Sequence, residues 1–266
     1  MKRLLGQTIG GLTRGSLNGP AWLRKITAFA LDGIDDRYQI NAPAGSFTLR
    51  VGNPLERWRA ETLFDKEPET IRWLNDTIAP DSVFYDVGAN IGIFTLYAAH
   101  LNETVRAICF EPESLNFARL NRNIVDNTLS DRVLAFPVAL GATFTARAFN
   151  LSRFQAGGAL HGNRHTVVQD APHRQGIVIT TLDDFLQSSS PLPSPTHLKI
   201  DVDGPEVDVL KGAAETLTTP ALRHLLVEAT ADNRGLIEQI AADAGFIFKE
   251  QGAESVDGTN IIFERA

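Results

Sequence analysis

Cysteine is nearly absent from this 266-residue chain, which contains only Cys109. A single cysteine cannot form a disulfide bond within the chain, and such sparse usage fits a reducing compartment. Cys109 lies in the apolar run 105–110, where we expect a small, buried core residue. A redox or nucleophilic role is the alternative interpretation of this thiol.

The sequence also lacks a hydrophobic stretch long enough to cross a bilayer. Residues 1–5 resemble the start of a signal peptide, but polar residues interrupt the apolar run at Gln7, Thr8 and Arg14. No other window approaches the length of a transmembrane helix. We therefore expect no stable membrane insertion and a cytoplasmic location.

An excess of positive charge is the third absence. Lysine and arginine number 25 against 32 acidic residues, which gives a net charge of −7. Bulk attraction to nucleic acid or anionic membrane requires the opposite sign, so neither is an expected partner, although a local basic patch is compatible with this total. The hydrophobic fraction of 43% is that of an ordinary globular protein, and the composition leaves the oligomeric state open.

The first 80 residues are expected to form an arm and an extension. Residues 1–20 are rich in small and basic residues, and Pro20 is suited to start a short amphipathic helix over about 22–29. A short strand is predicted at 47–51. Two helical pieces are predicted over 54–78, divided near Glu67 and Pro68.

From residue 82 to the C-terminus, short apolar runs alternate with helical patterns. The runs lie at 83–87, 105–110, 133–138, 198–202 and 225–228, and the helical stretches at about 91–101, 114–126, 205–217 and 232–244. This alternation predicts a parallel sheet covered by helices on both faces, in a domain that spans 81–266. Gly245 ends the last helix, and 246–249 with 259–263 are predicted to form an antiparallel hairpin.

An insertion over about 139–197 interrupts this alternation. It contains a predicted strand pair, at about 144–150 and 176–180, and then Thr181, which is suited to cap a helix that carries Asp183 and Asp184 in its first turn. A catalytic role for these two aspartates is the alternative to capping. Irregular insertions above such a sheet commonly carry substrate specificity.

Three histidines lie in the insertion, at His161, His165 and His173. The spacing of the first two fits metal ligands only on a helix, which the surrounding glycine, asparagine and proline disfavour. His161 is an alternative catalytic base, and solvated loop residues are the expected interpretation of all three.

The turn after the first strand of the domain is the strongest functional signal. It reads Asp86-Val87-Gly88-Ala89-Asn90-Ile91-Gly92. Its glycine spacing differs from the G-x-G-x-x-G dinucleotide fingerprint, and Asp86 would repel a pyrophosphate there. The ammonium and sulfonium groups of S-adenosylmethionine would instead be attracted, and Asn90 is suited to add a hydrogen bond. A plain turn without a ligand is the alternative.

The second strand ends at Glu111, and Pro112 stops it. An acid at this position is suited to accept hydrogen bonds from both ribose hydroxyls of an adenosine ligand. Because NAD and S-adenosylmethionine share the ribose, only Asp86 separates the two cofactors. The predicted cofactor-binding residues are Asp86, Gly88, Ala89, Asn90, Gly92, Glu111 and Pro112.

Four stretches, in the same order along the chain, resemble the motifs of the FkbM family of methyltransferases. They are 84–92, 110–112 with 120–123, 181–184 and 199–206. Residues 58–62 and 67–70 are similar to the N-terminal extension of one branch of that family. The chain departs at Asp203, where the family usually has a glutamate, so this carboxylate has a shorter reach.

The resemblance implies a class I methyltransferase fold of the Rossmann-like α/β type. Its sheet would have seven mostly parallel strands, an antiparallel last strand and helices on both faces, with the insertion between the third and fourth strands. The implied cofactor is S-adenosylmethionine, and the implied reaction is O-methylation of a hydroxyl on a sugar, glycan or natural product. Two alternatives stay open: a cofactor-binding interaction protein without catalysis, and an NAD-dependent oxidoreductase.

Acidic residues at the ends of the strands supply the candidate base. Lys199 and Asp201 are charged residues in a strand expected to be apolar, which is costly without a function or a partner. Asp86, Glu111, Asp201 and Glu228 are predicted to converge on one rim of the sheet. Methyl transfer requires a group that removes the hydroxyl proton, and burial that raises the pKa of a carboxylate would suit it to this task.

The predicted catalytic residues are Asp201 as first candidate base, then Asp203 and Glu206, with Lys199 as an ion-pair partner. For Asp203 and Glu206, capping of the helix that starts at Pro205 is an equally open interpretation. Asp201, Asp203 and Glu228 are also suited to bind Mg²⁺. We expect no metal, because the sequence shows no clear set of three ligands.

Overall fold

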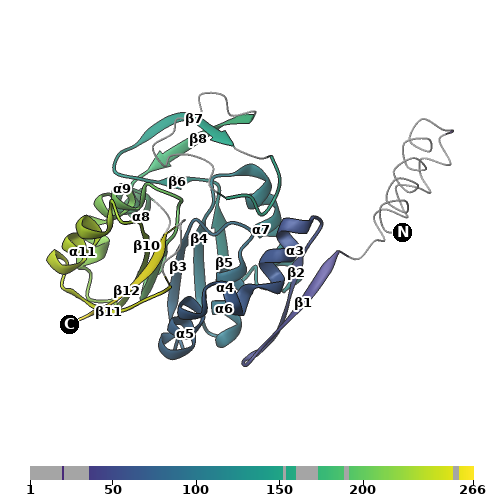
Figure 1. The fold of residues 1–266 in the computed structure, drawn as a ribbon, viewed down its shortest axis with the longest axis horizontal. Helices are drawn as coiled ribbons and strands as arrows, with labels where there is room; N and C mark the ends of the chain where they lie inside the picture. Colours follow the sequence, from purple (N-terminus) through teal and green to yellow (C-terminus); the bar gives the residue numbers. More distant parts are fainter. Residues whose placement is uncertain (1–19, 21–35, 152–153, 160–172, 189–191, 254–257) are drawn as a thin grey trace. The chain divides into compact units, whose positions relative to one another are not determined.

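The apolar runs that follow residue 82 form neighbouring strands of one seven-stranded sheet (Figure 1). The structure is a computed structural model that describes residues 20, 36–151, 154–159, 173–188, 192–253 and 258–266. The strands are β3 (Val83–Val87), β4 (Arg106–Phe110), β5 (Val133–Phe136), β9 (His197–Ile200), β10 (His224–Ala229), β11 (Phe246–Gln251) and β12 (Thr259–Arg265).

The strand order is β11-β12-β10-β9-β3-β4-β5. The pairings from β10 through β9, β3 and β4 to β5 are all parallel. Strand β12 is antiparallel to both of its neighbours, β10 and β11. The sheet therefore confirms the predicted class I methyltransferase fold, mostly parallel with an antiparallel last strand.

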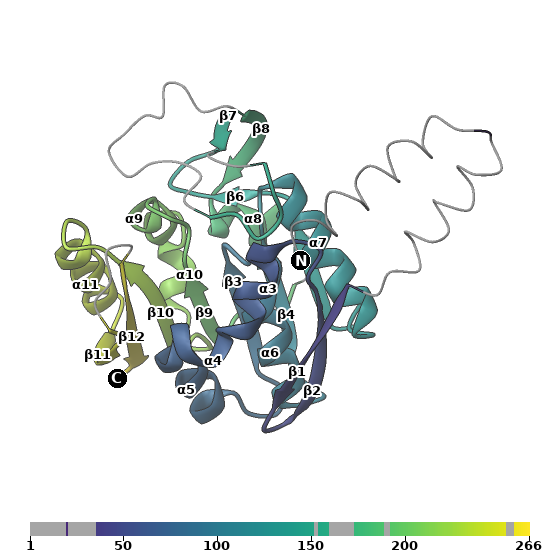
Figure 2. The same ribbon diagram turned by 45° about the vertical axis from the view of Figure 1, so that its right-hand side comes forward.

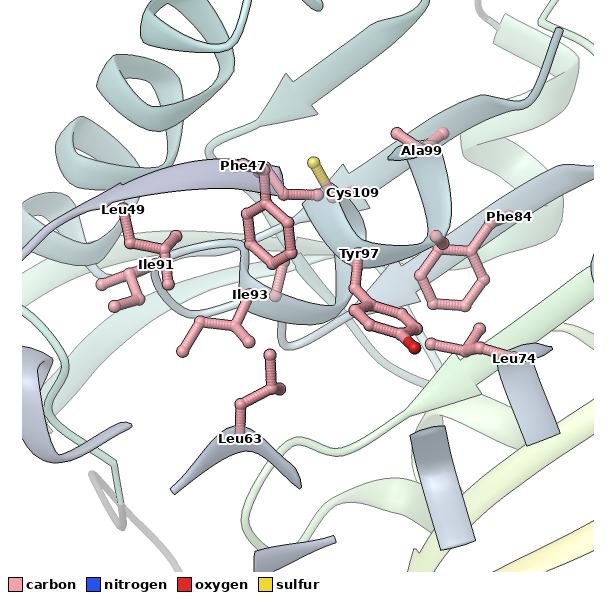
Figure 3. Packing of buried hydrophobic residues seen from close by; sticks show 14 of the residues in the cluster. Phe47, Leu49, Leu63, Leu74, Phe84, Ile91, Ile93, Tyr97, Ala99 and Cys109 are labelled. Atoms are coloured by element: carbon pink, nitrogen blue, oxygen red, sulfur yellow. The ribbon is translucent and has the colours of Figure 1, made fainter. Parts of the chain in front are cut away.

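Two hydrophobic clusters cover the two faces of the sheet, because successive residues of each strand point to opposite sides. Phe84 belongs to one cluster and Tyr85 to the other. Figure 3 shows part of the Phe84 cluster, with Phe47, Leu74 and Tyr97 among the labelled side chains. Cys109 is fully buried in it, as predicted for a core residue.

Different sets of helices cover the two faces of the sheet (Figure 2). Residues of α3 (Pro54–Glu61), α4 (Leu63–Lys66), α5 (Pro68–Thr77), α6 (Ile93–Leu101) and α7 (Ser114–Asp126) pack in the Phe84 cluster. Residues of α8 (Leu182–Ser188), α9 (Glu206–Lys211), α10 (Ala214–Thr218) and α11 (Arg234–Asp243) pack in the Tyr85 cluster.

The compact unit that carries the sheet runs from Tyr38 to Ala266. It therefore includes most of the predicted extension: β1 (Arg37–Ala42), β2 (Gly45–Arg50) and α3 to α5. The other unit is Met1–Arg37, and the helix predicted at 22–29 lies outside the described residues. The division predicted between residues 80 and 81 stays a prediction.

The extension begins with a hairpin and three short helices. Strand β2 is joined to α7 by side chains: Asn127 Oδ1 accepts a hydrogen bond from Thr48 N at 2.8 Å, and Asn123 Oδ1 from Arg50 N at 2.9 Å. The predicted break at Glu67–Pro68 is present. A second break, at Thr62, separates α3 from α4 and was not predicted.

The insertion between β5 and β9 forms a second sheet above the carboxyl ends of the main strands (Figures 1 and 2). It contains β6 (Ala139–Leu140), β7 (Thr145–Leu151) and β8 (His173–Thr180). The predicted strand pair is β7 with β8, which are antiparallel. Strand β6, only two residues long, pairs in parallel with β8 and was not predicted.

The helix that closes the insertion begins as its sequence indicates. Thr181 Oγ1 accepts a hydrogen bond from Asp184 N at 2.9 Å, as expected of a cap. Asp183 has a different partner: its carboxylate accepts from the backbone nitrogens of Glu215 and Thr216 and so joins α8 to α10. Among the helices described, none has the length and hydropathy needed to span a membrane.

Because the ring of His197 is buried, we expect the folding stability of the protein to depend on pH. It stacks on His224 with ring centroids 4.5 Å apart and makes hydrogen bonds with Thr196 Oγ1 and Thr77 Oγ1. Burial, and then the neighbouring His224, lower its pKa to about 3. The unfolded chain protonates this ring near pH 6.5, so stability is present above that pH and is lost as pH falls toward 3, by up to about 1.4 kcal/mol per pH unit.

Urea unfolding at pH 7.5, 6.0 and 5.0 measures this effect. We expect the free energy of unfolding to fall with pH more steeply in the unmodified protein than in His197→Phe, which keeps a ring but no titratable group. Equal slopes in the two proteins would contradict this role of His197.

Candidate active site

A cavity of about 560 Å³ opens at the carboxyl ends of the parallel strands. This volume is ordinary for a small-molecule site, and such crevices are where ligands of open α/β sheets bind. Its walls come from the loop after β3, the ends of β4, β9 and β10, the insertion, and helices α3 and α4.

Most of the predicted site residues line this cavity. They are Asp86, Gly88, Ala89, Asn90, Glu111, Pro112, Lys199, Asp201, Asp203 and Glu228. The predicted convergence of Asp86, Glu111, Asp201 and Glu228 on one rim is thus present. Gly92 and Glu206 do not line the cavity.

The floor of the cavity is a buried charge cluster. Asp86 and Lys199 are register partners on the adjacent strands β3 and β9, and each is 1% exposed. Lys199 Nζ lies 2.9 Å from Asp201 Oδ2 and 3.8 Å from Asp86 Oδ1. The predicted ion pair of Lys199 is therefore formed with Asp201.

The two carboxylate oxygens of Asp86 have different surroundings. Asp86 Oδ2 accepts a hydrogen bond from Thr95 Oγ1 at 2.6 Å, whereas Asp86 Oδ1 is buried and has no hydrogen-bond partner within the described residues. Burial raises the pKa of Asp86 more than Lys199 lowers it. A buried carboxylate oxygen without a donor is costly, so a cationic ligand would be stabilising here.

The pKa of Asp201 is lowered, which corrects the expectation that burial would raise it. Burial does raise the pKa, but the charge and hydrogen bond of Lys199 outweigh this effect, with further contributions from Lys66 and Arg59. The side chain is 26% exposed. Asp201 is therefore an ionised carboxylate that borders the cavity.

The backbone N–H groups of residues 88–92, in the loop after β3, are all used within the protein. Each N–H from residue 88 to residue 92 already donates to an acceptor within the protein. The acceptors are the Phe110 carbonyl for Gly88 and Ala89, Glu111 Oε2 for Asn90, Asn90 Oδ1 for Ile91 and the Ala89 carbonyl for Gly92, at 2.8–3.1 Å. A dinucleotide site needs such N–H groups free to bind the pyrophosphate.

Glu111 links this loop to the following helix. Its carboxylate accepts hydrogen bonds from Asn90 N and Glu113 N, both at 2.8 Å. Asn116 makes a side-chain hydrogen bond with the same carboxylate. Burial raises the pKa of Glu111 to about 7. Its predicted ribose contact stays a prediction.

A short segment of the insertion, 155–159, closes one side of the cavity. Asn90 Nδ2 donates to the Gly158 carbonyl at 2.6 Å, and the predicted contact of Asn90 with a cofactor stays a prediction. Arg59 Nε donates to the Gly157 carbonyl at 2.7 Å, and Asn116 Oδ1 accepts from Gly157 N at the same distance. The cofactor loop, α3 and α7 thus hold this segment together.

Residues 86–250, more than half of the chain, match the methyltransferase FkbM domain. The chain belongs to the FkbM methyltransferase family. It is a methyltransferase, which rules against the NAD-dependent oxidoreductase alternative.

Several named relatives of this FkbM methyltransferase are similar over most of its domain. Hexuronic acid methyltransferase AglP of Haloferax volcanii is 29% identical over 194 residues, 73% of each chain. Methyltransferase 1 of Beauveria bassiana is 31% identical over 146 residues, 50% of this chain and 58% of that one. The crystal structure of Methyltransferase FkbM from Methylobacillus flagellatus KT is 18% identical with a TM-score of 0.48, and the match covers 70% of this chain and 44% of that one.

Two asparagines of the FkbM methyltransferase have positioning roles that the sequence did not reveal. Asn116, almost fully buried, holds the 155–159 segment by both side-chain atoms. Asn123, fully buried, donates to the Ile91 carbonyl of the cofactor loop while it accepts from Arg50 N. The asparagine-rich stretch 120–123 was the available signal for the second of these.

Three acids at the rim come close together. Carboxylate oxygens of Asp201, Asp203 and Glu228 lie within 4.8 Å of one another. The reason given for expecting no metal, the lack of three ligands, is therefore wrong, because the fold brings Glu228 of β10 beside the β9 loop. Such a set is suited to a divalent cation or to a cationic ligand, and the absence of a metal stays a prediction.

Glu206 is buried and hydrogen-bonded within the FkbM methyltransferase. It is 1% exposed, and its carboxylate accepts hydrogen bonds from Gly204 N at 2.7 Å and from Asn233 Nδ2 at 3.1 Å. These contacts tie the turn before α9 to the residue before α11, and no side chain caps α9; the catalytic role predicted for Glu206 stays a prediction. His173 lies exposed in β8 beside Phe154, away from the cavity, and His161 and His165 fall outside the described residues.

We expect substitution of Gly88 and of Gly92 to destabilise the protein to different degrees. Both have positive φ, 86° at Gly88 and 87° at Gly92. A Cβ at Gly88 would lie 1.8 Å from the Asp201 carbonyl oxygen, whereas one at Gly92 would meet the end of the Leu120 side chain at 2.4 Å. Backbone cannot yield as a side chain does, so we expect Gly88→Ala to cost well over about 2 kcal/mol and Gly92→Ala about 1–2 kcal/mol.

Urea unfolding of the two variants checks this order. Gly92→Ala serves as the matched control, because it carries the same φ strain in the same loop. A Gly88→Ala protein no less stable than Gly92→Ala would show that the close approach of β3 and β9 is not a constraint.

Proposed function

We propose that this chain is an S-adenosylmethionine-dependent O-methyltransferase that acts on a hydroxyl of a sugar, a glycan or a related natural product. The observation that carries the proposal is the buried Asp86 Oδ1, which has no hydrogen-bond partner among the described residues and belongs to a side chain that lines a cavity where the amides of residues 88–92 already have acceptors. A cofactor with a positive charge fits this floor, and one with a pyrophosphate does not.

The residues present suit three parts of that cofactor. Asp86 would hold the ammonium group, and the Glu111 carboxylate would accept a hydrogen bond from the ribose hydroxyls. A second cavity of about 310 Å³ adjoins the first, since both are lined by Gly88, Pro112 and Phe149. Its walls include Val138, and its largely apolar lining suits the adenine base.

When bound, S-adenosylmethionine supplies an electrophilic methyl group. The chain must then orient the acceptor hydroxyl and remove its proton. We assign the proton to a carboxylate oxygen of Asp201, which Lys199 keeps ionised and fixed. The lowered pKa is compatible with this role, because a hydroxyl becomes far more acidic than a carboxylic acid as its oxygen forms the new bond.

One of the relatives supports the proposed kind of acceptor. AglP is named as a methyltransferase of hexuronic acid, and AglP and this chain align over 73% of each. The cavity supports a polyhydroxylated acceptor, because the rim acids Asp203 and Glu228 are suited to accept hydrogen bonds from hydroxyl groups.

Substitution of Asp86 and of Asp201 should have different effects, the first on cofactor affinity and the second on turnover. Asp86→Asn keeps the shape and the Thr95 contact but removes the charge, so we expect the Kd of S-adenosylmethionine to rise at least about tenfold. Asp201→Asn removes the base, so we expect kcat to fall by about 10²-fold or more, with cofactor affinity within threefold.

Calorimetry measures the binding, and release of S-adenosylhomocysteine measures the turnover, with and without EDTA. Asp183→Asn is the control, since Asp183 belongs to the same sequence motifs, does not line the cavity and has its carboxylate bonded to α10. Unchanged affinity in Asp86→Asn would refute the cofactor assignment, and full activity in Asp201→Asn would place the base elsewhere. Loss of activity in EDTA, restored by Mg²⁺, would show that the rim acids hold a metal.

A further inference from the structure

One face of the helical extension forms a wall of the active-site cavity. The residues that line it recur three and four apart, as on one side of a helix. They are Leu55, Trp58, Arg59, Thr62, Leu63, Lys66 and Glu67, from α3, α4 and the residues that join them to each other and to α5. The wall thus places two cations and a large aromatic ring beside a site whose floor and rim are acidic.

The two cations are available to a ligand. Arg59 Nε donates to Gly157, but its two terminal nitrogens make no hydrogen bond or ion pair with any of the residues described. Lys66 Nζ pairs with Glu67 Oε1 at 3.0 Å, and the lysine side chain is 48% exposed. Both charges help to lower the pKa of Asp201, after the larger effect of Lys199, which places them near the reacting groups.

The aromatic ring is Trp58, which is 44% exposed although its indole lines the cavity. Lys66 Nζ lies 6.0 Å from the centre of this ring. An exposed indole presents a broad apolar surface with a polar edge, suited to the face of a sugar ring. Arginine and lysine beside it are suited to a carboxylate, which the guanidinium binds by two parallel hydrogen bonds.

We infer that Trp58, Arg59 and Lys66 form the acceptor site, and that the acceptor is an acidic sugar, a hexuronate, whose ring lies on Trp58 and whose carboxylate is bound by Arg59 and Lys66. This inference rests on the proposed O-methyltransferase function. A hydroxyl of the sugar, not the carboxylate, then faces Asp201. The carbon–sulfur bond of the donor breaks as the carbon–oxygen bond forms, and the hydroxyl proton goes to Asp201.

Equilibrium binding to the full chain in the presence of S-adenosylhomocysteine tests the acceptor site. The probes are the methyl glycosides of glucuronic and galacturonic acid, each compared with its neutral counterpart, methyl glucoside or methyl galactoside. We expect at least one acid to bind tenfold or more tightly than its neutral partner. Arg59→Gln should remove most of that preference while the affinity for the neutral sugars stays within twofold.

Arg57→Gln is the matched control, because Arg57 lies on the same helix, pairs with Glu61 and does not line the cavity. It should leave both affinities within twofold. Trp58→Ala should weaken acidic and neutral sugars alike, by about tenfold.

Four results would overturn the inference. The first is that neither acid binds better than its neutral partner, and the second is that Arg59→Gln weakens acid and neutral sugars equally. The third is a tenfold loss of S-adenosylhomocysteine affinity in Arg59→Gln, which would assign Arg59 to the cofactor's carboxylate. The fourth is a product whose methyl group is released by mild alkali, as a methyl ester is.

The cofactor measurement separates this inference from the function on which it rests. If S-adenosylhomocysteine binds and the acids are not preferred, the acceptor site is wrong and the proposed function stands. If the cofactor does not bind to the unmodified protein, both are wrong.

Discussion

The contact of one buried lysine with two aspartates is the constraint around which the site is arranged. Lys199 is buried between Asp86 and Asp201, in strands that must be apolar for the sheet to be covered on both faces. A buried ammonium group requires a counter-charge, and Asp201 provides it at 2.9 Å. Asp86, the register partner of Lys199 on β3, therefore keeps one oxygen without a hydrogen-bond partner in the described part of the chain, one residue before the end of β3.

In the proposed cofactor site, the Asp86 carboxylate and not the loop backbone would contact the ligand. The amides of residues 88–92 are used within the protein, and Glu111 holds one of them. Strand β9 approaches so closely that only glycine fits at Gly88. We propose that the partners of these loop amides, together with Asp86, decide the charge of the adenosine ligand that the fold accepts.

The sequence predicted the fold well because the central strands of a covered sheet are short, apolar and separated by strong helix signals. It predicted neither β6, which has two residues and no periodicity, nor the break at Thr62. The rim of carboxylates was also predictable, since acids at the ends of parallel strands meet at one edge of the sheet.

Contacts between distant segments could not be read from the sequence. The direction of the pKa shift of Asp201 depends on Lys199, Lys66 and Arg59 together, and the last two lie on an extension about 140 residues earlier in the chain. The same holds for Asn90, whose amide is bound to Gly158 in the insertion. Spacing along the chain indicates neighbours within one element, not across elements.

Isothermal titration of the unmodified protein with two cofactors tests the central claim most directly. If Asp86 and the occupied loop amides select a cationic ligand, S-adenosylmethionine binds with one site per chain and NAD⁺ gives no binding heat at millimolar concentration. Binding of NAD⁺ without binding of S-adenosylmethionine would contradict the account.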